Sequence, residues 1–301
     1  MRCKARFRSL EKGSAVALVA PASPFEADRF EKGANLLRSA GYEVVAGKNI
    51  FKRRGYLAGT DQERLEDLME ALLDPAIQAI VCIRGGYGSG RLLCSIPFES
   101  LRENPKIFIG HSDITFLHLG LTSQAGWTTF HGPNLTGMSE KTHRAQSLLD
   151  VLSGKSSFSW RLTPEQILRP GRVKGPVFGG NLSCLTRLIG TPYLPDPAGA
   201  LLLIEDCGET LYRLDRMMTH LKLASVLPVL GGILLGDFDR CARQEDIFDM
   251  ILEHVNGYDF PIVCGLPFGH GEKNEVIALG ASFLLDTYER ELSILAPPFA
   301  R

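Results

Sequence analysis

The residues best suited to chemistry in this sequence lie between Lys106 and Thr115. An apolar run, Ile107–Ile109, leads into Gly-His-Ser-Asp at 110–113, and apolar residues then recur at helical spacing. This pattern predicts a strand, a tight turn and a helix, with Ser112 at the corner. Because such a corner exposes a hydroxyl and aims the first N–H groups of the helix at the group under attack, Ser112 is the candidate nucleophile.

A serine becomes nucleophilic at neutral pH when a general base takes its proton, and His270 is the candidate base. The segment Leu266–Gly271 follows an apolar strand, and the glycines beside His270 leave room for its ring to reach a partner. His111 is adjacent to Ser112, where side chains usually diverge. The histidines within predicted helices, where packed or solvated roles are more common, are His118, His143, His220 and His254.

The base in turn needs an acid that orients its ring, and two carboxylates stand out. Glu205 and Asp206 end the uninterrupted apolar strand 201–204, where a rigid element would hold them beside a cleft. Asp206 has a second explanation, because it could cap the helical segment that runs to Leu223. The pattern favours Glu205 but leaves the choice between the two open.

A glycine-rich loop, Gly85–Gly90, follows the predicted strand 79–83 and could bring backbone N–H donors close to a ligand. Its spacing fits neither a phosphate-binding P-loop nor a dinucleotide fingerprint. Arg84 and Arg91 flank the loop and could bind a carboxylate, although a surface role is the more common explanation for such arginines. No HExxH motif or histidine pair at ligand spacing is present, so we expect neither a metal nor a cofactor.

Alternating strands and helices must position these residues in the first half of the chain. Strands are predicted at 15–20, 42–45, 79–83, 107–109 and 127–130. Capping-box spacing at Ser23–Glu26 and Thr60–Glu63 predicts the starts of two helices. Such alternation favours a mostly parallel sheet with helices on both faces, whose ligands gather at the carboxyl ends of the strands. Those ends carry Arg84, Gly85, Gly86, Ser112 and His131.

The second half of the chain lacks the regular alternation of strands and helices. Polar residues without periodicity predict a linker at 153–172, between an N-terminal α/β domain at 1–152 and a C-terminal domain at 173–301. The C-terminal part mixes predicted strands and glycine turns with helical segments near 181–188 and 213–223. We therefore expect a smaller α/β or β-rich second domain.

Composition excludes several classes of function. The 301 residues are 45% apolar and 22% charged, the balance of a soluble globular protein, and a net charge of −1 offers no attraction to nucleic acid or an anionic membrane. The apolar run 15–20 is far shorter than the ~18 residues of a membrane span. Seven dispersed cysteines without CxxC spacing predict reduced thiols, and hence a cytoplasmic protein.

Several separate motifs occur in an order that resembles the LD-carboxypeptidases of the S66 serine peptidase group. That group includes muramoyltetrapeptide carboxypeptidases and the microcin C self-immunity peptidases. The motifs that carry the resemblance lie at Val16–Ser23, Ile83–Gly88, Ile109–Ile114, His131–Pro133, Gly179–Leu182, Leu203–Asp206 and Leu266–His270. The serine turn departs from a GxSxG elbow, because Ile114 stands where the second glycine would be.

The resemblance implies a role for each candidate residue. Ser112 from the N-terminal domain would be the nucleophile. Glu205 and His270 from the C-terminal domain would be the acid and the base. The N–H groups of Gly86 and Asp113 would form the oxyanion hole. The active site would then lie between the two domains of each subunit in a homodimer.

The function implied is that of a serine LD-carboxypeptidase that releases the terminal D-Ala of murein tetrapeptides, small peptide substrates of peptidoglycan recycling. Arg84 and His131 are expected to bind substrate. The nearest alternative is a microcin C self-immunity type of peptidase that acts on aminoacyl nucleotides. A non-catalytic protein that binds cell-wall fragments and a metal-dependent hydrolase are two further alternatives.

Overall fold

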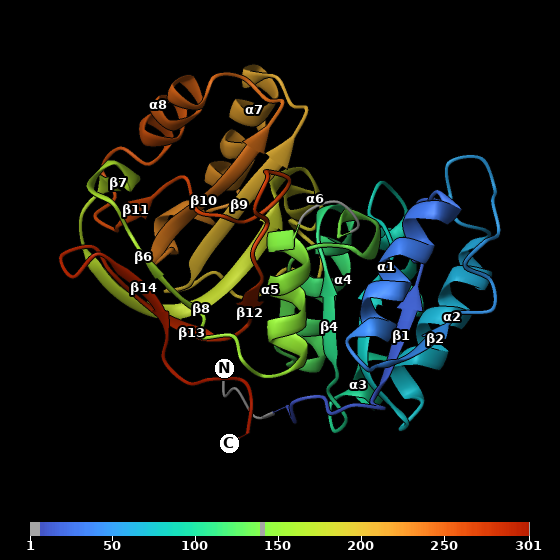
Figure 1. Ribbon diagram of the computed structural model, residues 1–301. Helices are drawn as coiled ribbons and strands as arrows, with labels where there is room; N and C mark the ends of the chain where they lie inside the picture. The colour runs from blue at the N-terminus through green and yellow to red at the C-terminus, as the bar shows by residue number, and fades with distance from the viewer. Residues whose placement is uncertain (1–6, 139–141, 301) are drawn as a thin grey trace.

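A computed structural model describes residues 7–138 and 142–300 (Figure 1). Within this part of the chain, a six-stranded sheet has the order β12-β5-β4-β3-β1-β2. Its strands are β1 (Ala15–Val19), β2 (Glu43–Ala46), β3 (Ile77–Cys82), β4 (Ile107–Gly110), β5 (Thr129–His131) and β12 (Ile277–Leu279). The pairs from β2 to β5 are parallel, as the alternation of elements predicts, and β12 pairs antiparallel with β5. A strand from the end of the chain therefore completes the first sheet.

Helices cover both faces of this sheet. They are α1 (Ala27–Ser39), α2 (Asp61–Leu73), α3 (Phe98–Leu101), α4 (Thr115–Gly120) and α5 (Thr142–Leu152). Alternate residues of β1 divide the core, because successive side chains of a strand point to opposite faces. Val16 and Leu18 pack with α1 and α5, whereas Ala17 and Val19 pack with α2 and α4.

The two predicted capping boxes have different outcomes. The box at Thr60 is confirmed, because its hydroxyl accepts the Glu63 N–H at 3.2 Å and the Glu63 carboxylate accepts the Thr60 N–H at 2.8 Å. The box at Ser23 is wrong: α1 begins at Ala27 without a side-chain cap. The Ser23 hydroxyl instead accepts the N–H of Tyr87 at 3.1 Å, and so supports the glycine-rich loop.

A second, mixed sheet forms most of the C-terminal half. Within the described residues it has eight strands in the order β6-β14-β13-β8-β9-β10-β11-β7, with β8 to β11 parallel. Its strands are β6 (Ser159–Arg161), β7 (Ile167–Arg169), β8 (Arg172–Asn181), β9 (Leu201–Cys207), β10 (Gly232–Asp239), β11 (Ile262–Val263), β13 (Ser282–Asp286) and β14 (Glu291–Ile294). Its helices are α6 (Leu182–Thr186), α7 (Leu211–Leu223) and α8 (Gln244–His254). The stretch 153–172, predicted as a linker, contributes the edge strands β6 and β7.

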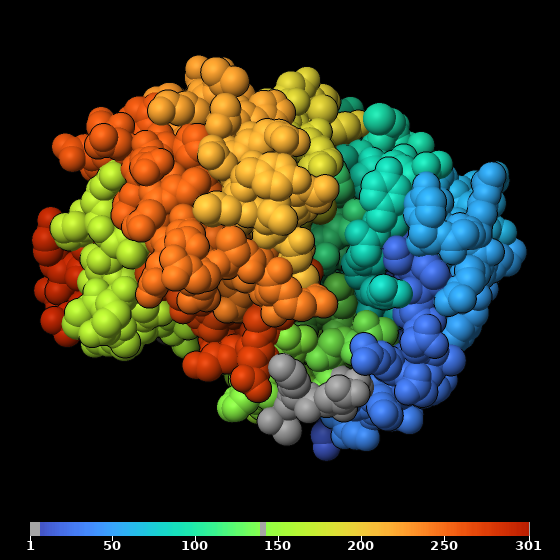
Figure 2. Space-filling model, turned by 90° about the horizontal axis from the view of Figure 1, so that it is seen from above, coloured from blue at the N-terminus to red at the C-terminus, as the bar shows by residue number. Residues whose placement is uncertain are grey.

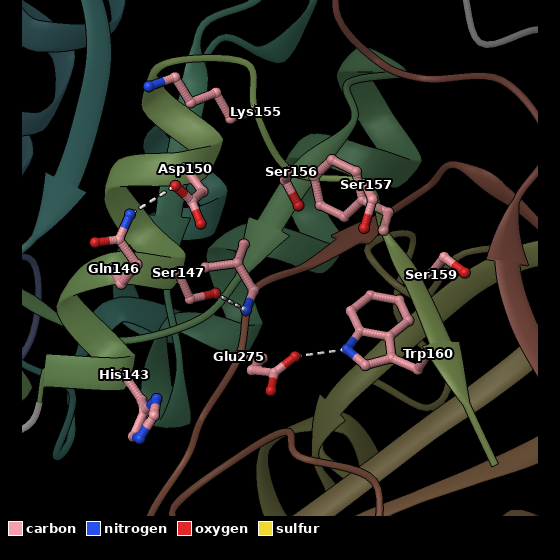
Figure 3. A pocket seen from close by; sticks show the side chains of 12 residues that line it. His143, Gln146, Ser147, Asp150, Lys155, Ser156, Ser157, Ser159, Trp160 and Glu275 are labelled. Atoms are coloured by element: carbon pink, nitrogen blue, oxygen red, sulfur yellow. Dashed lines mark hydrogen bonds between the residues drawn. The ribbon is translucent and has the colours of Figure 1, made fainter.

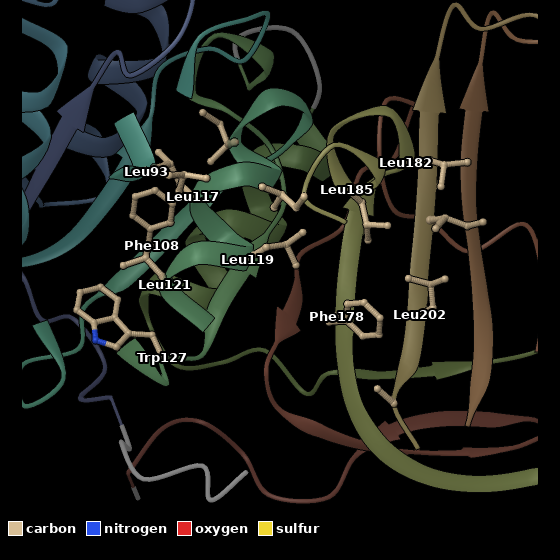
Figure 4. Close-up of a cluster of buried hydrophobic side chains, with 14 of the residues drawn as sticks. Leu93, Phe108, Leu117, Leu119, Leu121, Trp127, Phe178, Leu182, Leu185 and Leu202 are labelled. Atoms are coloured by element: carbon tan, nitrogen blue, oxygen red, sulfur yellow. The ribbon is translucent and has the colours of Figure 1, made fainter. Parts of the chain in front are cut away.

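The two halves share one hydrophobic core. Figure 4 shows Leu119 on the side of α4 that faces Leu185 of α6 and Phe178 of β8, and all three belong to one buried cluster. Gly180 permits the close approach, because a Cβ there would lie 2.7 Å from the Thr115 hydroxyl. That hydroxyl also accepts the N–H of Asn181 at 3.0 Å. Among the described residues, none of the helices combines the length and apolar character needed to span a bilayer.

Candidate active site

Ser112 occupies a strained turn at the end of β4. Its φ is 67°, in the left-handed region that costs a non-glycine residue free energy, and a short helical turn, Ser112–Ile114, leads directly into α4. Neighbouring contacts hold the turn: the Asp113 carboxylate accepts the Ser89 N–H at 2.7 Å, and the Asp113 carbonyl accepts the Ser89 hydroxyl at 2.6 Å. The Ser112 side chain is only partly buried, as a nucleophile requires.

The glycine-rich loop lies directly against this turn. A Cβ at Gly85 would be 2.8 Å from the Ser112 Cβ and 3.1 Å from its Oγ, so only glycine fits. Gly86 has a φ of 97° and is exposed beside the same turn. Asp113 is near the start of a helical turn, where N–H groups have no partner within the helix. These positions suit two N–H donors near one hydroxyl.

Three arginines lie near this loop, and two of them, Arg64 and Arg91, share the Asp61 carboxylate. Arg64 is buried and donates to the Gly88 carbonyl at 2.9 Å and to the Pro21 carbonyl, a loop support that sequence reasoning missed. Arg91 is paired with the Asp61 carboxylate through bonds of 2.7 to 3.0 Å. Arg84 is exposed and donates to the Pro24 carbonyl.

The structure brings Glu205 and His270 together. The Glu205 Oε2 lies 2.6 Å from the His270 Nδ1, with the carboxylate fully buried and 18% of the imidazole side chain exposed. The loop that carries His270 is fastened to β10, because the Phe268 carbonyl accepts the Asp237 N–H at 2.8 Å. Gly269 permits the contact, since a Cβ there would lie 2.6 Å from the Glu205 Oε2.

Asp206 has a structural role, but not the one that the sequence suggests. Its Oδ1 accepts the side-chain amide of Asn181 and its Oδ2 accepts the N–H of Ser183, both at 2.9 Å. It therefore caps α6, whereas Thr210 precedes α7. Because Asp206 is occupied in this way, Glu205 is the carboxylate available to His270.

Further histidines surround the same carboxylate. The His131 Nε2 is 3.7 Å from the Glu205 Oε1, and the His111 ring centroid is 4.9 Å from that of His270. His118 lies 6.2 Å from His131, ring to ring, and its Nε2 contacts the Gly110 carbonyl at 2.8 Å. Sequence reasoning missed this cluster, although Gly110 and His131 end adjacent parallel strands.

Ser112 and His270 are brought near each other through His111. His111, which precedes Ser112, lies against the His270 ring, with 4.9 Å between the ring centroids. Within the described part of the chain, no hydrogen bond joins the Ser112 hydroxyl to His270. Catalytic hydrogen bonds in unliganded sites are often long and tighten when substrate binds, so the absence of this bond does not exclude the pair.

Burial and charge set the protonation states. Burial opposes ionisation of Glu205, but His270 and His131 beside it lower the pKa of the carboxyl below its usual value. Burial also opposes the charged form of His270, yet Glu205 outweighs it and raises the pKa of the imidazole. Burial lowers the pKa of His118 to about 3 and that of His111 well below its usual value. The pair can therefore act as an oriented base, with Nε2 free to accept a proton.

The site lies between the two halves. Figure 2 shows a furrow between C-terminal residues, in orange and gold, and N-terminal residues, in teal and blue. A cavity of about 390 Å³ opens beside Asp113 and is also lined by Gly88, Phe116, Arg187 and Tyr193. Among the described residues, no three His, Cys, Asp or Glu side chains are grouped so that they could hold a metal ion.

Comparisons with known proteins give one consistent family. The LD-carboxypeptidase N-terminal domain matches residues 16–132, and the LD-carboxypeptidase C-terminal domain matches residues 174–285. The chain is 36% identical to the probable murein peptide carboxypeptidase of Bacillus subtilis, over 96% of this chain and 94% of that protein. It is also 36% identical to the murein tetrapeptide carboxypeptidase of Pseudomonas aeruginosa, over 90% and 92%. A structure of MccF in complex with glutamyl sulfamoyl guanosine has a TM-score of 0.89 at 26% identity, covering 99% of this chain and 100% of that chain.

The contact between Gly85 and Ser112 gives a stability prediction. Gly85→Ala should lower the free energy of unfolding by about 1–3 kcal/mol, because the added methyl group forces the Ser112 turn to shift. Gly137→Ala is the matched control, since its Cβ would meet only the Arg144 guanidinium at 3.4 Å. Urea denaturation of the two variants measures the difference. Equal free energies of unfolding for the two variants would show that Gly85 is not in close contact with the Ser112 turn.

Proposed function

Because the chain belongs to the LD-carboxypeptidase family, we propose that it is a serine carboxypeptidase that removes the terminal D-Ala of murein tetrapeptides in peptidoglycan recycling. The scissile bond would be the amide between the L-centre of meso-diaminopimelate and D-Ala. The relatives named murein peptide and murein tetrapeptide carboxypeptidase support this choice of substrate. The observation that carries the proposal is the 2.6 Å contact of Glu205 with His270, near the strained Ser112 turn.

The proposed mechanism is acyl transfer through a serine ester. The His270 Nε2 takes the Ser112 proton as the hydroxyl attacks the carbonyl, and Glu205 holds the ring in the tautomer with Nδ1 protonated. The N–H groups of Gly86 and Asp113 stabilise the oxyanion, each by about 3 kcal/mol. His270 then protonates the departing amine, and D-Ala leaves. In the second step His270 takes a proton from water as the water attacks the ester, and it returns that proton to the Ser112 oxygen as the ester bond breaks.

A carboxypeptidase must also bind the free carboxylate of its substrate. Of the two arginines beside the glycine-rich loop, Arg91 already pairs with Asp61, so Arg84 is the better candidate. His131 is fully buried behind Glu205, and this position suits support of the carboxylate better than contact with substrate.

An aminoacyl nucleotide is the competing substrate, because the fold also matches MccF over nearly its whole length. A purine would need an aromatic face to stack on. Trp127 is enclosed in the core and donates to the Leu101 carbonyl at 2.8 Å. Trp160 is held by Glu275 and packs edge-on against Phe268. The tryptophans therefore do not supply this face, whereas Tyr87, Phe116 and Tyr193 line the cavity beside Asp113. The preference for the muropeptide rests on the named relatives.

We further propose a cytoplasmic homodimer. The six cysteines in the described residues are free thiols, which suits a reducing compartment. The dimer follows from the family resemblance alone. Light scattering of the purified protein measures its mass in solution.

The substrate itself is tested by mass spectrometry. Incubation of the protein with murein tetrapeptide should give tripeptide and free D-Ala, whereas an aminoacyl sulfamoyl adenylate should remain intact. The opposite result would assign the chain to the aminoacyl nucleotide substrate. Inertness to both substrates and to a fluorophosphonate probe would support a binding protein, and loss of hydrolysis with a chelator would indicate a metal enzyme.

Ser112→Ala and His270→Ala should each lower kcat by about 10³-fold or more without unfolding the protein, because each removes a member of one proton-transfer unit. Release of D-Ala measures the rate, and circular dichroism checks the fold. Ser100→Ala, which alters an exposed hydroxyl of α3, is the control and should retain full activity. Full activity of Ser112→Ala would refute the serine mechanism.

The pH profile tests the Glu205–His270 pair. His270 must be neutral to accept a proton, and Glu205 raises the pKa of its imidazole, so kcat/KM should fall as the pH drops through that raised pKa. Glu205→Gln removes the anion and lowers the pKa of His270. The low-pH decline of kcat/KM should then move to lower pH. The maximum value of kcat/KM should fall by up to about 10⁴-fold, because Gln no longer holds the imidazole in the tautomer with Nδ1 protonated. An unmoved decline would show that another carboxylate faces His270.

A further inference from the structure

Arg144 of α5 binds the backbone of the loop that carries His270. Its guanidinium donates to three successive carbonyl groups, at 3.2 Å to His270, at 3.1 Å to Glu272, and also to Gly271. Arg144 and His270 are 126 residues apart in the chain. One side chain of the N-terminal half therefore holds the backbone of residues 270–272 in place.

The contact continues along the same face of α5. Ser147 lies three residues after Arg144, so the two side chains are neighbours on the helix surface. The Ser147 hydroxyl accepts the Val276 N–H at 2.9 Å, and Figure 3 shows this bond beside the one from Trp160 to Glu275, which measures 2.6 Å. The segment that follows His270 is thus held along the helix at both ends.

This loop needs external support because of its sequence. His270 stands between two glycines, and Gly269 has a φ of 108° that few other residues adopt. A glycine-flanked segment has many competing backbone conformations, and only some of them place the imidazole on Glu205. Hydrogen bonds from a charged donor are stronger than neutral ones, so the guanidinium is well suited to select one conformation.

Nearby carboxylates compensate the charge of Arg144. Burial lowers the pKa of the guanidinium, whereas Asp237 and Asp239 oppose that effect. Burial and the nearby Glu205 raise the pKa of Asp237 to about 6. A Cβ at Gly271 would collide with the Asp237 carboxylate, so Asp237 and Arg144 confine the loop at the same residue.

We propose that Arg144 is a positioning residue for catalysis, which holds His270 on Glu205 and toward Ser112 by fixing the backbone of residues 270–272 to α5. The proposal rests on the serine mechanism above. A displacement of ~1 Å at a reacting group costs roughly 10²-fold in rate, so the contact should control kcat more than substrate affinity.

The test compares Arg144→Gln with Arg169→Gln. Arg169 is the matched control, because it also donates to backbone carbonyls, those of Tyr258 and Val255 after the end of α8, but not to the loop that carries His270. Arg144→Gln should lower kcat for D-Ala release by about 10²-fold with KM changed less than about threefold. Arg169→Gln should leave kcat unchanged, and Arg144→Lys should recover part of the loss, because an ammonium group still donates to carbonyls.

A second readout separates positioning from stability. If the loop loosens, His270 loses contact with Glu205 and the pKa of its imidazole falls, so the acid limb should move to lower pH. The charged and titratable groups that act on this ring are Glu205, Asp206, Asp239 and His111, whereas Asp237 and Arg144 face the loop that carries it. A smaller folded fraction would lower the rate without moving the limb. An unmoved limb, or an unchanged kcat, overturns the proposal.

A fluorophosphonate probe keeps this test independent of the substrate. The probe reacts with an activated serine whichever amide the enzyme cleaves, so its rate constant should fall by about 10²-fold in Arg144→Gln. Labelled wild-type protein that leaves tetrapeptide intact would refute only the muropeptide substrate. Equal labelling of wild type and Arg144→Gln would refute only the positioning role. Absence of labelling at Ser112 in wild-type protein would refute both.

Discussion

The site depends on keeping one carboxylate charged where water is excluded. Glu205 has no exposed surface, and burial alone would raise its pKa. The imidazoles of His270 and His131 reverse that effect, and they do so strongly because electrostatic interactions are less screened in the interior. The surrounding backbone must then approach closely enough to exclude water. Cβ atoms at Gly236 and Gly269 would lie 3.3 and 2.7 Å from the Glu205 Cβ, so glycine at these positions is part of the same constraint.

Burial and contact with Glu205 distinguish the four rings of this cluster, which are His111, His118, His131 and His270. Burial lowers the pKa of His111 and His118, so these rings stay neutral and serve as packing and hydrogen-bonding groups. His270 alone among the four combines a direct bond to Glu205 with partial exposure. His270 is therefore the ring of this cluster best suited to the proton transfer proposed above.

Local patterns in the sequence predicted the parts of the site that rest on local structure. The turn at Ser112, the strand that carries Glu205 and the glycines around His270 are each encoded within about ten residues. The supporting contacts could not be found in this way. Arg144 and Arg64 look like ordinary surface arginines, because their carbonyl partners are distant in the chain or belong to irregular backbone. The strands in 153–172 were missed for the same reason: they are short edge strands, which depend on their partners for stability. The apolar run 276–278 does predict a strand, but not that β12 joins the first sheet.

Since Ser112 and the Glu205–His270 pair belong to different halves, their alignment is a property of the contact between the halves. Some contacts at that boundary lie close to the candidate residues: Thr115 follows the Ser112 turn, and its hydroxyl receives the N–H of Asn181. Gly180 lies against both Thr115 and the ring of His131. Arg144 adds a contact from α5 to the loop that carries His270. Such packing is stiff, because interiors are as dense as organic crystals. A site whose candidate residues are divided between two halves therefore requires this shared core, and the core positions the residues as much as it stabilises the chain.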